Sequence, residues 1–165
     1  MKHLAVGVAA VVSGCGILTG SPTAAAEPVA PQHGAPCSQA VAGALTRLPD
    51  LMTVLQCTDQ RSGEYRWQTF DSPYPKSDRW LTYGPQLTLG GEGQRNREID
   101  SGDWIAYPQT SDTQCRAAQL DLTGEGERTP PQVSTAEPGQ PLKLRVLPLL
   151  FNVELQGYCL WQKVQ

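Results

Sequence analysis

Few residues of this chain have the types and spacing that enzymes use for nucleophilic or general acid–base catalysis. After the first 26 residues the sole histidine is His33, which lies in a Pro-rich stretch. Ser-His-Asp and Cys-His mechanisms therefore have no well-positioned imidazole base. The sequence also contains no G-x-S-x-G, S-x-x-K or H-E-x-x-H pattern. Serine hydrolases, penicillin-binding acyl enzymes and zinc proteases thus lose their sequence support.

Paired carboxylates are the catalytic class that leaves no local signature. Asp100 and Asp103 flank Gly102 and precede Trp104, an aromatic residue that could stack on a sugar. We expect instead a hydrogen-bonded turn, because Asp side chains bond their own backbone in turns. Residues 121–127 hold three carboxylates, but their spacing differs from that of a calcium loop. A solvated turn is predicted there, and we expect no cofactor.

Four cysteines remain after residue 26, an even number that in an exported chain indicates two disulfides. Four cysteines allow three pairings. We predict Cys37 with Cys57 and Cys115 with Cys159, because closing the shortest loops costs the least entropy. No C-x-x-C pair is present, and a single histidine would have to complete any site. A zinc site is therefore not expected, and no metal is predicted.

Two polar segments combine basic and aromatic residues and could form a binding patch. Arginine beside aromatics can hold an acidic glycan, a lipid phosphate or a partner protein. The alternative is that Trp80 anchors a strand in the core while Arg79 pairs with a surface carboxylate; burial is also the expectation for the other tryptophans. The candidate patch consists of Lys76, Arg79, Trp80, Arg95 and Arg97.

The composition bounds the fold and the partners. The 165 residues, 17.9 kDa, are enough for one domain, and 16 Gly with 14 Pro disfavour a helical bundle. The formal charge is -3, with acidic residues scattered along the chain. No basic stretch suits nucleic acid or an anionic membrane surface, so neither is an expected partner.

The first 26 residues have the order of a secretory signal: Lys2, an apolar run over 4–12, a break at Pro22 and small residues ending at Ala26. Cleavage is predicted after Ala26. The alternative is a lipobox at residues 12–15, in which Cys15 would be acylated and anchor the protein to the membrane. The apolar run is shorter than the ~20 residues that a bilayer requires, so no transmembrane span is expected.

The remaining chain is predicted as a flexible Pro-rich leader over 27–36 and one domain over 37–165. Residues 38–48 place Val41, Ala44, Leu45 and Leu48 at helical spacing, which predicts a short helix. Alternation of apolar residues then predicts strands, with a register break near Gly157. The expected strands cover residues 52–57, 65–70, 80–83, 86–89, 104–107, 115–122, 142–147 and 153–162. These elements indicate a mainly β fold: a small antiparallel β-sandwich or open barrel with one short N-terminal helix and two disulfides.

Several short motifs are shared with a known group of proteins: Pro36-Cys37, the RWLTYGP run over 79–85, SGDW over 101–104, QCRA over 114–117 and GYCLW over 157–161. In this pattern the chain resembles small exported proteins of mycobacteria and related actinobacteria. The resemblance implies export and disulfides. It implies no activity, because that group carries no assigned function.

The sequence thus favours a secreted or cell-envelope binding or structural module without catalysis, whose partner would be an envelope component or a protein. One alternative is a carboxylate-dependent hydrolase of envelope glycans. Another is a disulfide-stabilised protease inhibitor that presents residues 74–79 as its exposed loop.

Overall fold

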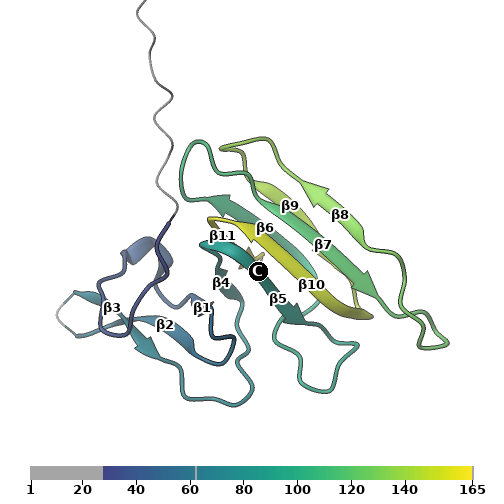
Figure 1. Ribbon diagram of the computed structural model, residues 1–165, viewed down its shortest axis with the longest axis horizontal. Coiled ribbons are helices and arrows are strands. Elements are labelled where there is room, and N and C mark those ends of the chain that lie inside the picture. Colours follow the sequence, from purple (N-terminus) through teal and green to yellow (C-terminus); the bar gives the residue numbers. More distant parts are fainter. Residues whose placement is uncertain (1–27, 62, 165) are drawn as a thin grey trace, which may run out of the picture.

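The structure of the protein is a computed structural model that describes residues 28–61 and 63–164 (Figure 1). The predicted signal segment and Cys15 lie outside the described residues. A short 3-10 helix, η1 (Gln39–Val41), precedes the strands. The strands are β1 (Leu45–Arg47), β2 (Val54–Asp59), β3 (Tyr65–Thr69), β4 (Arg79–Leu81), β5 (Gly84–Gly90), β6 (Gly102–Pro108), β7 (Arg116–Asp121), β8 (Gln132–Thr135), β9 (Leu142–Val146), β10 (Leu150–Gly157) and β11 (Cys159–Lys163).

The strands form two sheets, which confirms the mainly β prediction. The seven-stranded sheet has the order β3-β2-β1-β4-β11-β6-β9, and the four-stranded sheet has the order β5-β10-β7-β8. Neighbouring strands are antiparallel except for β1 and β4, which are parallel. In Figure 1 the first three strands form one wing of the molecule, and β5 to β11 form its body.

The two sheets bury one common core. The tryptophans of β4, β6 and β11 in the larger sheet pack with leucines and valines of β5 and β10 in the smaller sheet. Alternation accounts for this arrangement: Leu142, Leu144 and Val146 of β9 are buried, whereas the intervening Lys143 and Arg145 are exposed. All four tryptophans are buried, as predicted. A second apolar cluster covers the opposite face of the larger sheet, because Leu55 and Leu160 alternate with the core residues Val54 and Trp161.

The chain passes from one sheet to the other at a corner where β4 leads into β5 and β10 leads into β11. The predicted break near Gly157 is confirmed, because the β10–β5 register shifts between Leu155 and Gly157. Gly157 has φ +91°, and a Cβ there would lie 2.3 Å from the carbonyl oxygen of Gln114. The corner therefore depends on glycine at this position. Across the corner, the backbone N–H of Thr82 donates to the carbonyl of Cys159.

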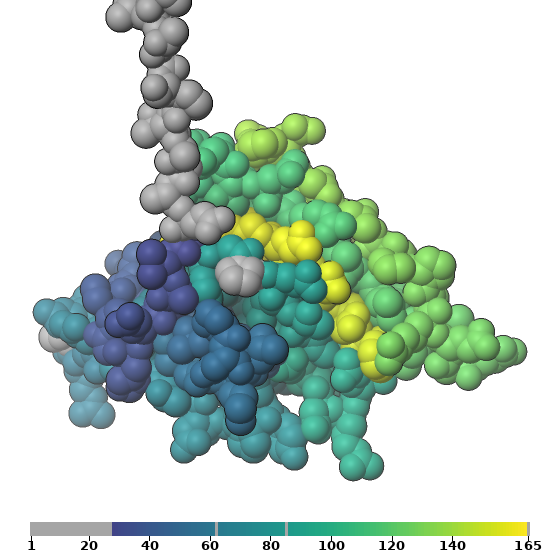
Figure 2. All heavy atoms as spheres, in the orientation of Figure 1, coloured from purple at the N-terminus to yellow at the C-terminus, as the bar shows by residue number. Residues whose placement is uncertain are grey.

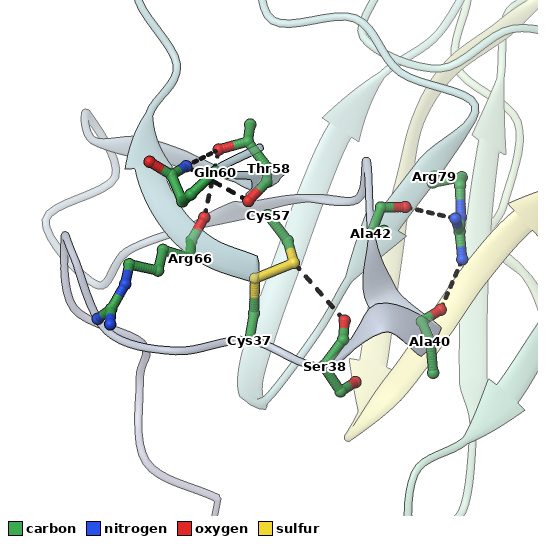
Figure 3. The surroundings of a disulfide bond; sticks show 9 residues. All are labelled: Cys37, Ser38, Ala40, Ala42, Cys57, Thr58, Gln60, Arg66 and Arg79. Carbon is green, nitrogen blue, oxygen red and sulfur yellow. Dashed lines mark hydrogen bonds between the residues drawn. A yellow bond between two sulfur atoms is a disulfide. The ribbon is translucent and has the colours of Figure 1, made fainter. Parts of the chain in front are cut away.

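Both predicted disulfides are confirmed, Cys37–Cys57 and Cys115–Cys159, with Cα atoms 6.1 and 6.0 Å apart. The second joins the segment before β7 to β11 and thus links the two sheets. The first ties the segment before η1 to β2 (Figure 3). The end of the Pro-rich leader lies along β3, where the Gly34 N–H donates to the Trp67 carbonyl and the Trp67 N–H donates to the Ala35 carbonyl.

The predicted helix over residues 38–48 is wrong. The segment forms η1 and then β1, which pairs with β2. Gly43, with φ +77°, ends the helical turn, and Val41 and Leu45 enter different apolar clusters. A helix this short has little stability of its own, so the sheet pairing and the neighbouring disulfide decide the conformation. The polar strand β8 was likewise not predicted. In the described part of the chain, no helix has the length and apolar character needed to cross a membrane.

Candidate functional site

The predicted basic patch is assembled only in part. Lys76, in the β3–β4 loop, and Arg97, in the β5–β6 loop, both contact the Asp100 carboxylate, at 2.8 and 2.9 Å. Lys163 of β11 approaches the same carboxylate at 4.0 Å and was not predicted to take part. Asp100 therefore offsets part of the positive charge that the sequence placed here.

The other members of the patch have different roles. Arg79 donates to the carbonyls of Ala40 and Ala42 at the end of η1, the Ala40 bond being 2.8 Å long (Figure 3). Trp80 is fully buried in the core. Arg95 is exposed in the β5–β6 loop. The structure therefore gives Arg79 and Trp80 structural positions. The alternative of a core Trp80 holds, but its prediction that Arg79 pairs with a surface carboxylate is wrong, because the guanidinium bonds backbone carbonyls instead.

The carboxylates do not form the site that a glycosidase would need at this turn. Asp100 is held by the cations described above, whereas Asp103 pairs with Arg145 at 2.8 Å. Trp104 is buried, and its indole N–H donates to the Asp100 carbonyl at 3.0 Å, so its ring is not available to stack on a sugar. The predicted turn is therefore present, but among the described residues ion pairs and a bond to the Asp100 backbone brace it, rather than bonds from the Asp side chains to their own backbone.

The acidic loop at residues 121–127 does not converge on a point either. Glu125 and Glu127 are exposed, and Asp121 is buried at the end of β7. Burial raises the pKa of Asp121, and its Oδ1 has no hydrogen-bond partner. Within residues 28–61 and 63–164, no group of three or more His, Cys, Asp or Glu side chains could hold a metal ion.

A groove of about 310 Å³ lies where β4 turns into β5. Leu48, Pro49 and Leu51, from the β1–β2 turn, form one wall. The edge of β5, from Gln86 to Thr88, forms the opposite wall. Tyr83 and Leu81 lie between these walls. In Figure 2 the blue atoms of the β1–β2 turn lie beside the teal atoms of β5 on the face turned to the viewer. The volume of the groove is at the lower end of the range for ligand pockets, roughly 300–1,000 Å³.

Three of the polar side chains that line this groove, Arg47, Thr82 and Tyr83, already have partners. The Tyr83 hydroxyl donates to the Arg47 carbonyl at 2.7 Å, and burial, with a smaller contribution from the negative charge of Asp50, raises the Tyr83 pKa. The Arg47 guanidinium pairs with Glu98, and the Thr82 hydroxyl bonds the backbone across the corner. Among the described residues lining the groove, none is a free nucleophile or general base. The apolar side chains of the lining are of the kind that small binding grooves present.

The β1–β2 turn presents two exposed apolar side chains, of which Leu51 lines the groove and Met52 follows it in the chain. Leu51 is 74% exposed and Met52 is 89% exposed. Asp50 accepts bonds from the Met52 N–H at 3.0 Å and from the Thr53 N–H at 2.8 Å. The Thr53 hydroxyl also donates to Asp50, at 2.6 Å, and is the main reason that the Asp50 pKa is lowered, followed by the backbone bonds. The turn is therefore held in one conformation.

Leu51 adopts φ +61°, a left-handed conformation that costs an L-residue about 1–2 kcal/mol. An exposed, strained leucine contributes little to folding, which favours a role in contact with a partner. The sequence interpretation ended the helix at residue 48 and began the next strand at residue 52, and it did not identify this apolar turn. The signal that could have found it is Pro49-Asp50, a turn dipeptide, followed directly by two large apolar residues.

No family model matches the chain, and neither a curated protein nor a solved structure matches it. What the groove can bind therefore follows from its own geometry and chemistry.

Proposed function

We propose that this protein is an exported, non-catalytic binding domain that holds an apolar group of its partner in the groove between the β1–β2 turn and β5. The observation that carries the proposal is the combination of an apolar wall with the side chains of Arg47, Thr82 and Tyr83, which are already bonded within the protein. Leu51 lines the groove and is mostly exposed, as is the neighbouring Met52, so a partner that contacts the turn would remove apolar surface from water. The partner would be a component of the cell envelope or a protein outside the cytoplasm.

Export is the second part of the proposal. The N-terminal sequence up to Ala26 has the order of a secretory signal, and two disulfides suit an oxidising compartment. Intact-mass analysis of the processed protein is expected to show a chain that starts at Glu27. A lipid-modified Cys15 at the N-terminus would instead establish the membrane-anchored form. We also propose that the chain is one of the small exported proteins of actinobacteria that its motifs resemble.

For the architecture we propose the sandwich rather than the open barrel. Support comes from the separate strand orders of the two sheets and from their common core. A side chain of the smaller sheet also bonds the backbone at the end of β9, the edge strand of the larger sheet. The Gln119 side chain of β7 donates to the Arg145 carbonyl at 2.9 Å and accepts from the Leu147 N–H at 3.4 Å.

One observation favours the inhibitor as a second candidate function. Protease inhibitors present a rigid exposed segment, and the β1–β2 turn displays Leu51 and Met52 on a turn braced by Asp50. The turn lies outside the loop over 74–79 that the sequence favoured. Inhibition of a protease with an apolar specificity pocket, lost in Met52→Asp, would support this function. Cleavage of the intact protein at the turn without inhibition would contradict it.

The groove itself can be tested with an apolar fluorescent dye, anilinonaphthalene sulfonate, and the folded protein. Binding is expected to weaken by about five- to tenfold in Leu51→Ser, because an apolar contact worth about 1 kcal/mol is lost. The matched control is Leu149→Ser, a change at another exposed leucine, 54% exposed, in the β9–β10 turn. Equal dye affinity in both variants, or no dye binding to the native protein, would contradict the proposed function.

A further inference from the structure

Strand β5 forms one edge of the four-stranded sheet and pairs with β10 on one side only. Its register places Leu89 opposite Val153 and Leu87 opposite Leu155. The side chains of Leu87 and Leu89 enter the core, whereas Gln86 and Thr88 are exposed. Backbone groups alternate along a strand with the same period of two as the side chains.

The hydrogen bonds of β5 show which backbone groups point away from β10. The Thr88 carbonyl accepts from the Arg47 guanidinium at 3.2 Å. The Gly90 N–H donates to the Glu98 carboxylate at 3.0 Å, and the Gly90 carbonyl accepts from the Glu98 N–H at 2.8 Å. Residues 88 and 90 therefore direct their backbone groups outward. By alternation, Gln86 does so as well.

The outer edge is closed at one end and open at the other. Arg47 and Glu98, which pair with each other, cover the carbonyl of Thr88 and both backbone groups of Gly90. Apart from the hydrogen bonds between paired strands, no described backbone group bonds the Gln86 N–H, the Gln86 carbonyl or the Thr88 N–H. These groups lie along the wall of the groove that Gln86 and Thr88 help to line.

The edge carries part of the usual protection against pairing. Natural edge strands are commonly guarded by charged side chains or proline; β5, from Gly84 to Gly90, carries no charged side chain, and its one proline, Pro85, precedes the open stretch that starts at Gln86. A strand edge with free donors and acceptors, facing an apolar wall across a groove, is complementary to one kind of ligand. That ligand is an extended polypeptide, whose backbone completes the hydrogen bonds while its side chains contact the wall.

We propose that the groove receives an extended segment of a partner protein, which pairs with the open edge of β5 around Gln86 and adds a short fifth strand to the sheet. This inference rests on the proposed function and names the partner class. Because Leu48, Pro49 and Leu51 form the facing wall, the segment carries an apolar side chain there and no charge. The pairing is short, since Arg47 and Glu98 block the edge beyond Thr88.

The test uses a library of random linear peptides, selected for binding to the purified protein. The best peptide is then synthesised with a methyl group on each backbone nitrogen in turn. If it pairs as a strand, methylation at the one nitrogen whose N–H donates to the Gln86 carbonyl weakens binding about tenfold or more, because it removes that donor and leaves the carbonyl unpaired. Methylation at the two neighbouring nitrogens has little effect, because those N–H groups point away from β5.

Amide hydrogen exchange locates the pairing. With the peptide bound, exchange at the Gln86 and Thr88 amides is expected to slow by at least about tenfold, the effect of burying and bonding an exposed N–H. The amides of β8, the opposite edge of the same sheet, serve as the internal control and are expected not to change.

The outcomes separate the inference from the proposed function. If peptides bind and Leu51→Ser weakens them, but Gln86 exchange is unchanged, the groove binds and strand pairing is wrong. If no peptide is selected, the inference is overturned, and dye binding decides the proposed function independently. If Gln86 is already protected in a dimer of the purified protein, a second copy occupies the edge, which also overturns the inference.

Discussion

Replacing Leu51 by glycine is expected to stabilise the fold relative to replacement by alanine. At an ordinary position in a helix or strand the order is reversed, because glycine loses more backbone entropy on folding, by about 0.5–1 kcal/mol. At φ +61° an alanine retains the left-handed strain of about 1–2 kcal/mol, whereas glycine carries almost none. The difference of these terms leaves Leu51→Gly more stable than Leu51→Ala by about 0.5–1 kcal/mol.

Side-chain burial changes this balance little, because Leu51 is 74% exposed and both variants remove the same contacts beyond Cβ. The free energy of unfolding can be measured in urea from the fluorescence of the four buried tryptophans. Both Leu51 variants are expected to lose affinity for the dye and for a selected peptide. Leu51→Gly thus loses affinity while it is more stable than Leu51→Ala, as expected if leucine is retained there for contact rather than for folding.

Arg61 provides the matched control, since it is also exposed and has φ +66° in the β2–β3 turn. Arg61→Gly is expected to be more stable than Arg61→Ala by a similar amount, with dye and peptide binding unchanged. If Leu51→Gly proves less stable than Leu51→Ala at an unchanged denaturant slope, the turn does not hold the left-handed conformation. The reasoning about strain would then be refuted.

Four further predictions concern stability. Replacing both Cys115 and Cys159 by alanine should lower the free energy of unfolding, measured in urea, by about 4 kcal/mol, the loop-entropy cost for a loop of this length. A cost smaller than that of removing the Cys37–Cys57 bridge would contradict this. Because burial raises the pKa of Asp121, the native state binds this proton more tightly than the unfolded state, and stability is lost as pH rises above the ordinary 3.8. Asp121→Asn should therefore be more stable than the native protein by about 1 kcal/mol at pH 7, and this difference should disappear in acid. Equal urea midpoints for the two proteins at pH 7 would disprove this. Arg79→Ala should lower stability by about 2 kcal/mol, because two carbonyls lose a charged donor, while dye binding stays constant. Gly157→Ala should cost about 3 kcal/mol or more, given its φ and the contact with the Gln114 carbonyl, and a well-folded variant of native stability would exclude that close approach.

Much of the fold follows from local patterns in the sequence. Alternating apolar residues identify β9, because one face of that strand is buried and the other is wet. Gly157 marks the sheet corner, since a register break with glycine suits a bulge. Both disulfide pairs follow from loop entropy, as nearest neighbours close at the lowest cost. Each of these signals is local or depends on sequence separation alone.

The N-terminal segment shows where such signals fail. Val41, Ala44, Leu45 and Leu48 satisfy helical spacing, yet the same residues can also divide between two faces of a sheet. The choice depends on partners far along the chain: β2 supplies the strand ladder, and Arg79 caps the carbonyls after η1. β8 was missed for a related reason, because an edge strand that is mostly exposed needs no apolar alternation.

The candidate site belongs wholly to the tertiary structure. The sequence alone determined the residue types that exclude familiar catalysis, the cysteine framework and the strand periodicity. Only the fold decided that Asp100 would gather Lys76, Arg97 and Lys163, and that the turn after β1 would stand opposite the edge of β5. Leu51 and Gln86 have no shared pattern in the sequence. They line one groove because β4 leaves its sheet at Thr82 and continues as the edge of the other, and no local periodicity encodes that crossing.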